Sequence, residues 1–283
     1  MLKPGQTFRI CVYVLVLGNS PTGTSGDSAG TTSVLTRAHA HNDYEHTRPL
    51  FDALDHGFAS VEADVHFVDG NLLVAHERKD ARADRSLRSL YLDPLQKRVR
   101  DNGGYVFRES SQSLLLLIDI KADGEGTWSE LQRLLGSYRN MLTSFGDQPE
   151  VGSVTIVLTG NRPDLASFGS KPLRYAAMDG RLNEMSTTVP VSLMPLVSAA
   201  WKDHFTWQGT GPMPTLEQQE LQRIVEQVHA QGRALRFWGA PDNPAMWREL
   251  TNAGIDHLNT DDLAGMRRFL TSDPHQADQH SRR

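Results

Sequence analysis

The sequence predicts an α/β protein, and the expected fold is a TIM (β/α)8 barrel with some distortion. Three observations support this prediction. From Val34 onward, runs with strand character alternate with segments of helical apolar spacing. Eight such strand runs occur, and eight parallel strands close a barrel. No glycine-rich dinucleotide loop follows the first strand, which leaves a doubly wound open sheet as the second choice.

The length and composition fit one barrel domain. The chain has 283 residues and 39% hydrophobic content, which is enough for one large core. Barrels of this class commonly reach this size as a single domain. No linker rich in Pro, Ser or charge divides the chain after residue 35. We therefore expect the barrel to cover residues 35–271.

The expected strands are apolar or alternating runs bounded by turn-forming residues. In chain order they are Leu35–His41, Ala59–Phe67, Leu114–Lys121, Ser153–Thr159, Leu173–Met178, Val191–Val197, Ala234–Trp238 and Ile255–Asn259. The segment Gly160–Pro172, between the fourth and fifth strands, is short and contains several Pro and Gly residues. Any helix there should be small, so the distortion of the barrel is expected at this point.

The expected helices have apolar residues at helical spacing and recognisable ends. They are Arg48–Asp55, Thr127–Phe145, Leu216–Gln231, Pro244–Ala253 and Leu263–Leu270. Asn243 precedes a first-turn proline and suits the N-cap position. Gly232 and Gly254 follow two of the helices, where glycine favours termination.

The two ends of the chain differ from the barrel segment. Lys3 and Arg9 accompany Ile10–Gly18, an apolar run too short to span a bilayer. This pattern is typical of an export signal, so residues 1–34 are interpreted as a signal peptide and polar leader. The alternative is an unstructured tail on a cytosolic enzyme. Residues 272–283 are polar and are expected to form a disordered tail. We expect a secreted or periplasmic protein with no transmembrane span.

Charge and cysteine content exclude several classes of function. The net charge is −5 and no basic block exists, so no nucleic acid partner is expected. Cys11 is the single cysteine, which rules out an internal disulfide and a cysteine-based metal site. The chain is expected to act as a monomer.

The second expected strand carries two carboxylates on one face. Alternate residues from Val61 to Phe67 are apolar, whereas Glu62 and Asp64 share the opposite face. Because helices cover the outside of a barrel, both acids should point inward. Two inward carboxylates repel each other unless a cation or protons lie between them. A solvated acidic strand edge is the alternative, but a closed barrel has no edge.

The third expected strand ends in a similar way. The aliphatic run Leu114–Ile118 is followed by Asp119-Ile-Lys121, and Asp119 and Lys121 share a face. An acid in this setting is costly to bury unless it is paired or bound to metal. An Asp119–Lys121 ion pair is the simple explanation, and it is compatible with a metal site.

Histidines lie close to the expected strand ends. His39 and His41 share the inward face of the first strand, and His76 follows the short run Leu72–Ala75. Active sites of such barrels lie at the C-terminal ends of the strands. Histidines from two strand ends, beside three carboxylates, suit general acid and general base roles. His41 and His76 are therefore the catalytic candidates.

The last two strands supply candidates for substrate binding. Arg236 and Trp238 share one face of the seventh strand, and Asn259-Thr-Asp-Asp262 closes the eighth. Arg236 is suited to bind phosphate as a bidentate donor. Trp238 is suited to an apolar wall for a lipid or alcohol portion, although packing at the barrel mouth explains it equally well.

With these residues in place, the chain resembles the phospholipase C-like phosphodiesterase superfamily, which includes glycerophosphodiester phosphodiesterases and sphingomyelinase D. It is most similar to the branch named after altered inheritance of mitochondria protein 6, which combines three motifs in order. Here these are His41–Tyr44, Glu62–Val65 and Asn259–Asp262. The similarity runs from about Ala38 to Leu270. It implies a distorted eight-stranded barrel that binds one magnesium or calcium ion.

The resemblance also implies roles for individual residues. His41 and His76 fall on the two catalytic histidines. The three expected metal ligands are carboxylates, namely Glu62, Asp64 and Asp119. Lys121 matches a basic residue near the phosphate in sphingomyelinase D, and we group it with Arg236, Trp238 and Asn259 as the expected substrate-binding set.

Two departures from the superfamily pattern affect the expected substrate. The His-Arg-Gly start of glycerophosphodiesterases is replaced by His41-Asn-Asp43, and their Glu-Asn-Thr ligand motif is missing between Tyr44 and Leu54. Asn42 or Asp43 is left to fill that gap. Lysophospholipids, phosphoinositides and sphingomyelin therefore remain open as substrates beside glycerophosphodiesters.

The expected function is a metal-dependent phosphoric diester hydrolase acting on a small phosphodiester or a phospholipid headgroup. One histidine would deprotonate the attacking hydroxyl and the other would protonate the leaving oxygen. A zinc amidohydrolase is one alternative, suggested by His39-Ala-His41. That class needs histidines or a lysine at later strand ends, where this chain has Thr159, Asp179 and Ser198. A non-catalytic secreted binding protein on this scaffold is the other alternative.

Overall fold

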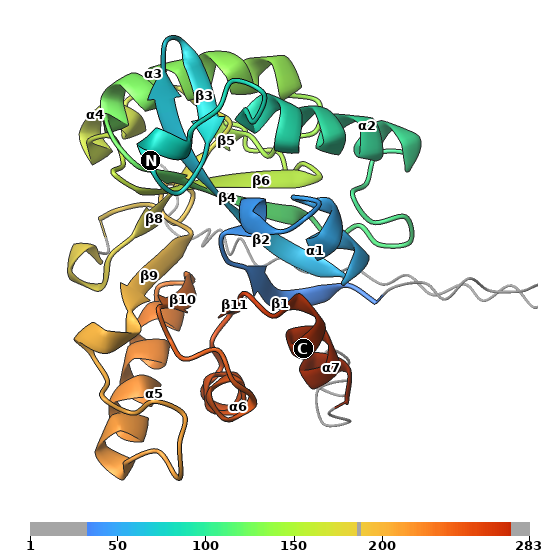
Figure 1. Ribbon diagram of the computed structural model, residues 1–283. Coiled ribbons are helices and arrows are strands. Elements are labelled where there is room, and N and C mark those ends of the chain that lie inside the picture. The colour runs from blue at the N-terminus through green and yellow to red at the C-terminus, as the bar shows by residue number, and fades with distance from the viewer. Residues whose placement is uncertain (1–32, 186–187, 273–283) are drawn as a thin grey trace, which may run out of the picture.

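The computed structural model describes residues 33–185 and 188–272, which form a closed barrel of parallel strands with helices outside it (Figure 1). The barrel strands are β1 (Leu35–Ala40), β2 (Phe58–Val68), β4 (Leu114–Ile120), β6 (Val154–Gly160), β8 (Ala177–Gly180), β9 (Leu196–Ala200), β10 (Ala234–Trp238) and β11 (His257–Thr260). Their order is β1-β11-β10-β9-β8-β6-β4-β2, and the pairing of β1 with β2 closes the sheet. The predicted (β/α)8 barrel is confirmed.

One further strand extends β2 beyond the barrel. β3 (Asn71–Val74) pairs antiparallel with the end of β2 around a turn in which Asp69 and Gly70 both have positive φ, 48° and 77°. Glycine adopts this conformation without steric cost, and Asp tolerates it better than most residues. The hairpin returns the chain to the barrel, so His76 comes back beside Asp64.

Seven α-helices occur among the described residues, and Figure 1 shows them around the outside of the sheet. They are α1 (Phe51–Asp55), α2 (Asp93–Asp101), α3 (Gly124–Leu135), α4 (Leu165–Gly169), α5 (Thr215–His229), α6 (Pro244–Ala253) and α7 (Leu263–Ser272). The small helix expected between the fourth and fifth strands is α4. Between β8 and β9 the described residues hold only a 3-10 turn, Leu182–Glu184, so the irregular part of the barrel extends further than expected.

The ends of α6 follow the sequence signals. The Asn243 side chain accepts hydrogen bonds from the backbone N–H groups of Ala245 and Met246, and Pro244 occupies the first turn. Gly254 ends the helix with φ 92°, a left-handed conformation that glycine adopts readily. Both expected signals are confirmed here.

The expected fifth strand, Leu173–Met178, is wrong at its start. Leu173–Arg174 forms a separate strand, β7, which pairs antiparallel with β5 (Phe145–Gly146), and the barrel strand β8 begins at Ala177. The apolar run favoured a strand over its whole length, but its first two residues belong to a separate two-stranded sheet. The strand extends instead to Asp179 and Gly180, because Asp179 is a buried inward-facing acid rather than the start of a loop.

Two other expected boundaries are also wrong. The expected helix Thr127–Phe145 ends at Leu135, before Gly136, and its final residue belongs to β5. The expected strand Val191–Val197 begins at Leu196 as β9, immediately after Pro195. Proline has no N–H to donate to a neighbouring strand, so it marks the start of the paired segment.

The apolar side chains form two layers. The larger core fills the space between the sheet and the helices and includes Leu116, Ile118 and Ile120 of β4. The smaller core lies inside the barrel and consists of Leu117, Phe145, Val157, Ala177 and Leu196. Alternate residues of a strand point to opposite faces. The inward side chains that follow this inner core toward the C-terminal ends of β2 and β4 are the acids Glu62, Asp64 and Asp119, which belong to a polar layer above it.

The expected leader and tail lie almost wholly outside the described residues, apart from residues 33, 34 and 272. Within the described ranges, no helix combines the length and the apolar composition that a membrane crossing requires.

Candidate active site

Three inward carboxylates gather at the C-terminal ends of β2 and β4. Glu62, Asp64 and Asp119 each offer an oxygen within 4.8 Å of the others. Asp64 and Asp119 are register partners on adjacent strands, which brings their side chains to the same face. Asp64 is fully buried, and its Oδ1 has no hydrogen-bond partner. The strand pattern predicted this cluster correctly.

Gly160 leaves room for one of these acids. It ends β6 with φ 74°, beside Asp119 on the neighbouring strand. A Cβ atom at this position would overlap Asp119 Oδ1 and the backbone oxygen of Ile120. Glycine is therefore required by both backbone conformation and space.

Lys121 lies between two of the carboxylates. Its Nζ is 2.7 Å from Asp64 Oδ2 and 2.9 Å from Asp119 Oδ2. Burial disfavours the charged ammonium, but the two acids outweigh this effect and raise the pKa of Lys121. The expected Asp119–Lys121 ion pair is present, and Lys121 offsets part of the repulsion within the cluster.

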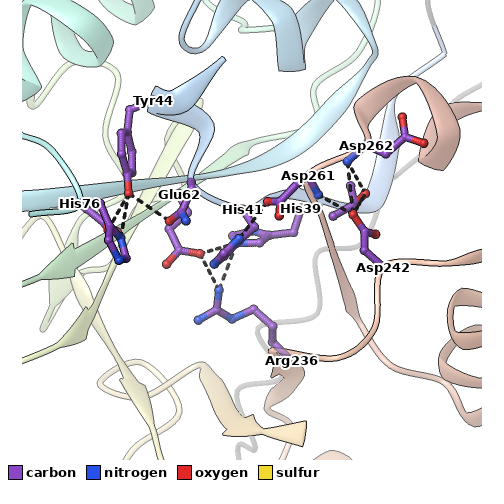
Figure 2. Close-up of polar contacts among 12 residues, drawn as sticks. His39, His41, Tyr44, Glu62, His76, Arg236, Asp242, Asp261 and Asp262 are labelled. Atoms are coloured by element: carbon purple, nitrogen blue, oxygen red, sulfur yellow. Dashed lines mark hydrogen bonds and ion pairs between the residues drawn. The ribbon is translucent and has the colours of Figure 1, made fainter. Parts of the chain in front are cut away.

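Glu62 belongs to a buried network that crosses the barrel (Figure 2). Its Oε2 is 2.9 Å from Nη1 of Arg236 and 3.1 Å from Nε2 of His39. Arg236 also donates from Nε to Ser198 Oγ, and Ser60 Oγ lies 2.6 Å from His39 Nδ1. Burial opposes ionisation of Glu62, but Arg236 and His39 hold its pKa well below the usual range. Burial lowers the pKa of His39 to about 3, so this ring is neutral.

The two catalytic candidates lie on opposite sides of Glu62 in the view of Figure 2. His41 follows β1, and its Nδ1 is 2.9 Å from Asp261 Oδ1. Burial opposes protonation of His41, but Asp261 and Glu62 outweigh it and raise the pKa of His41. Asp261 is held in turn by its backbone N–H, which donates to Asp242 Oδ2 at 2.8 Å.

His76 makes a different set of contacts. Its Nδ1 is 3.0 Å from Asp64 Oδ2 and 3.4 Å from the Tyr44 hydroxyl, and its side chain is 55% exposed. Tyr44 is nearly buried and donates to Asp64 Oδ2 at 2.7 Å. A proton on His76 Nδ1 would be shared with Asp64, whereas Nε2 makes only a 4.0 Å ion pair with exposed Glu77, so Nε2 is the nitrogen available to a substrate.

Asn42 and Asp43, the two candidates to replace the missing Glu-Asn-Thr ligand motif, lie in different surroundings. Asn42 has φ 45° and its Oδ1 lies 3.1 Å from the Tyr44 hydroxyl, at the edge of the site. Asp43 instead accepts hydrogen bonds from Leu50 N–H at 2.6 Å and from the Tyr91 hydroxyl at 2.8 Å. Asp43 thus anchors the loop after β1 and is absent from the carboxylate cluster.

The other expected substrate-binding residues differ in accessibility. Trp238 is 42% exposed at the end of β10. Asn259 is the register partner of His39 and shares its inward face, and both polar atoms of its amide are buried without partners. Arg236 is 3% exposed and already contacts three protein groups.

Sequence reasoning missed three contributors. Tyr44 and Asp261 were seen only as parts of motifs, and Asp179 only as a strand end without histidine. Asp179 is fully buried, accepts from Thr159 Oγ1 at 2.8 Å and has an unpartnered Oδ1. Strand alternation could have found Asp179, because it shares a face with Ala177. Tyr44 and Asp261 gave no such signal, since both follow strand ends in turns.

The donor set fits a hard divalent cation. The cluster found among the described residues consists of carboxylates alone, and such cations prefer oxygen ligands. The free, buried Oδ1 of Asp64 is an additional indication, because an unpaired buried oxygen is costly. Zinc favours nitrogen and sulfur ligands, which weakens the amidohydrolase alternative.

Comparison with known proteins agrees with this arrangement. Residues 31–171 match the model of an AIM6-like phosphodiesterase domain, and residues 234–264 match that of the glycerophosphoryl diester phosphodiesterase family. A crystal structure of a glycerophosphodiester phosphodiesterase from Parabacteroides distasonis superimposes with a TM-score of 0.52 at 15% identity. The match covers 86% of this chain and 99% of that one. At this identity the likeness supports the fold.

Two relatives cover most of the chain. Altered inheritance of mitochondria protein 6 from Eremothecium gossypii is 32% identical over 275 residues, covering 83% of this chain and 70% of that protein. A homolog from Arthroderma benhamiae is 28% identical over 259 residues, covering 80% and 81%. The chain therefore belongs to the altered inheritance of mitochondria protein 6 family and has a phosphodiesterase-type barrel of the glycerophosphodiesterase superfamily.

Proposed function

We propose that this protein is a metal-dependent phosphoric diester hydrolase. The observation that carries the proposal is the carboxylate cluster of Glu62, Asp64 and Asp119, with one histidine on each side of it. One magnesium or calcium ion would be held by these three acids. When bound, such an ion would draw off negative charge that develops on the phosphate.

The contacts of the two histidines suggest distinct roles. Asp64 contacts Nδ1 of His76; with the proton on Nδ1, Nε2 is available as a general base for the attacking hydroxyl. His41 has a raised pKa through Asp261, which favours the protonated ring and suits a general acid for the leaving oxygen. Both assignments require the substrate to lie between the two rings.

The surroundings of the cluster support a phosphodiester rather than a neutral substrate. Lys121 and Arg236 bring two positive charges to a mouth that also holds the proposed cation. Trp238, exposed at the rim, could contact the apolar or alcohol portion. The candidate substrates are lysophospholipids, phosphoinositides, sphingomyelin and glycerophosphodiesters.

A panel of these phosphodiesters, incubated with magnesium, with calcium and with a chelator, tests the proposal. We expect cleavage of at least one substrate that stops when the ion is removed. His41→Ala and His76→Ala should each lower kcat at least roughly hundredfold, the usual contribution of a general acid or base. The matched control is His229→Ala, which removes an imidazole that contacts Asp256 at the C-terminal end of α5. No cleavage of any diester, or equal cleavage with chelator, would contradict the proposal.

The metal ligands can be tested without turnover. Asp119→Asn should weaken magnesium or calcium binding in a calorimetric titration, because one of three anionic ligands becomes neutral. Asp84→Asn is the control, since Asp84 is exposed and pairs only with nearby Arg82 among the described contacts. Equal affinity of Asp119→Asn and the parent protein would remove Asp119 from the ligand set.

Export forms a second part of the proposal. Its support is the charged start and the apolar run Ile10–Gly18 of the sequence. N-terminal sequencing of the protein secreted or extracted from its own host would test it. Retention of Met1 in the mature protein would contradict the signal peptide.

A further inference from the structure

Lys121, Arg236 and Arg181 are cationic side chains near the barrel mouth, and they differ in how firmly they are held. Lys121 makes two ion pairs of 2.7 and 2.9 Å and its side chain is 22% exposed. Arg236 is almost fully buried and contacts Glu62, Ser198 and His39. Arg181 makes one ion pair of 3.4 Å, to Asp179, and its side chain is 33% exposed. Arg181 is thus the most accessible and the most loosely paired of the three.

The backbone of Arg181 is held by Glu184, and its guanidinium makes one long contact, to Asp179. Arg181 directly follows β8, and its backbone N–H donates to Glu184 Oε2 at 2.9 Å. Asp179 and Arg181 are two residues apart, so strand alternation directs both side chains toward the interior of the barrel mouth. The 3.4 Å contact between them agrees with this direction.

A short series of contacts connects Arg181 with the carboxylate cluster. Asp119 on β4 is the register partner of Thr159 on β6. Thr159 Oγ1 donates to the same Asp179 oxygen, Oδ2, that Arg181 approaches. Neighbouring strands lie about 4.8 Å apart, so the backbone of Asp179 is roughly 10 Å from that of Asp119. An arginine side chain on this wall can reach a phosphate beside Asp119.

We propose that Arg181 is a phosphate-binding residue of this enzyme and that Asp179 positions it. The inference rests on the proposed function. It assigns binding of the substrate phosphate to Arg181, whereas the sequence had suggested Arg236 for this role. Arg236 already donates to Glu62 and Ser198, whereas Arg181 can turn its planar donors toward an anion. Asp179, held by Thr159, keeps the guanidinium at the mouth until substrate arrives.

Loss of the Arg181 guanidinium should affect substrate binding more than the chemical step. A guanidinium that contacts a non-bridging phosphate oxygen interacts with both the ground state and the transition state. Loss of such uniform binding raises KM and leaves kcat largely unchanged. A charge-assisted hydrogen bond of this kind corresponds to roughly a tenfold to hundredfold change in affinity.

The test compares Arg181→Gln and Arg181→Lys with Arg223→Gln. Arg223 is a surface residue of α5 paired with Glu220, so its loss removes the same charge away from the site. For a cleaved diester, Arg181→Gln should raise KM at least tenfold with kcat within about threefold, Arg181→Lys should fall between, and the control should match the parent. A KM of Arg181→Gln within twofold of the parent value would overturn the proposal.

A binding measurement separates this inference from the proposed function. Inorganic phosphate is titrated calorimetrically into the parent protein and the same variants, with magnesium present, after circular dichroism has shown equal folding. We expect at least tenfold weaker phosphate binding by Arg181→Gln and no change in the control. Equal binding by the parent and Arg181→Gln, or binding by neither, contradicts the role of Arg181 even if diesters are cleaved. Absence of diester cleavage alone contradicts the proposed function.

Discussion

Asp43 allows a quantitative prediction about stability and pH. Its carboxyl group is fully buried, and Oδ2 accepts both available hydrogen bonds, from Leu50 N–H and the Tyr91 hydroxyl. Oδ1 has no partner, so a proton there costs no existing contact. Burial raises the pKa of Asp43 from 3.8 to about 6, against the opposing effect of the two hydrogen bonds.

The sign and size of the effect follow from the difference between folded and unfolded chains. Between pH 3.8 and about 6 the folded chain binds a proton at Asp43 that the unfolded chain releases. The free energy of unfolding therefore falls as pH rises through this window. A shift of about two pH units corresponds to about 3 kcal/mol, of which about 2 kcal/mol is lost between pH 4.5 and 7.5.

Asp43→Asn removes this titration while keeping an oxygen acceptor for Leu50 and Tyr91. The new amide places an N–H where Oδ1 lacks a partner, which costs about 1–3 kcal/mol at every pH. The difference between variant and parent should still change by about 2 kcal/mol in favour of the variant from pH 4.5 to 7.5.

Urea unfolding at several pH values measures this difference directly. All other groups titrate alike in the two proteins, so their contributions cancel. Asp84→Asn serves as the control, because Asp84 is exposed and its substitution should leave a nearly constant difference. A difference for Asp43→Asn that does not vary with pH would refute the reasoning.

Three other predictions concern the site. Tyr44→Phe removes the donor to Asp64 and should lower kcat roughly tenfold, with some loss of thermal stability, since hydrogen bonds to charged groups contribute about 1.5–3 kcal/mol; a kcat within twofold would contradict it. Gly160→Ala should weaken magnesium binding at least tenfold in calorimetry, because its Cβ overlaps Asp119 Oδ1; unchanged affinity would contradict it. Asp261→Asn should lower the pKa of His41 observed by NMR, and should move the basic limb of the pH–rate profile to lower pH; an unmoved limb would contradict the acid role.

The barrel and its carboxylates could be predicted because both depend on local patterns. Alternation along β2 and β4 placed Glu62, Asp64 and Asp119 on one face before any contact was known, and the structure brings them together. The strand boundaries were less predictable where a pattern was interrupted. Asp179 was expected only as a strand end, because its burial depends on neighbours from β6 and β9 that lie far away in the sequence.

The contacts of Arg236 show that alternation along one strand does not predict the long-range partners of a side chain. The sequence placed Arg236 on one face of its strand with Trp238, and its donors were expected to bind phosphate. The structure gives two of its nitrogens to Glu62 and Ser198, residues 174 and 38 positions away. Such pairings depend on how the barrel closes, and closure is set by strand tilt and register rather than by any one strand. Because Arg236 is already paired, the proposed phosphate ligand is Arg181.

The His41–Tyr44 motif combines scaffold and site residues in one turn. Asn42 adopts a left-handed conformation, after which Asp43 points into the outer core and Tyr44 returns to Asp64. Asp43 anchors this turn through Leu50 and Tyr91, so its hydrogen bonds fix the position from which Tyr44 reaches the cluster. Asp64 Oδ2 is then shared among Tyr44, His76 and Lys121, and Oδ1, which has no partner, is available to the proposed cation. A chain that keeps the motif but lacks the Asp43 anchor should therefore lose the Tyr44–Asp64 hydrogen bond before it loses the barrel.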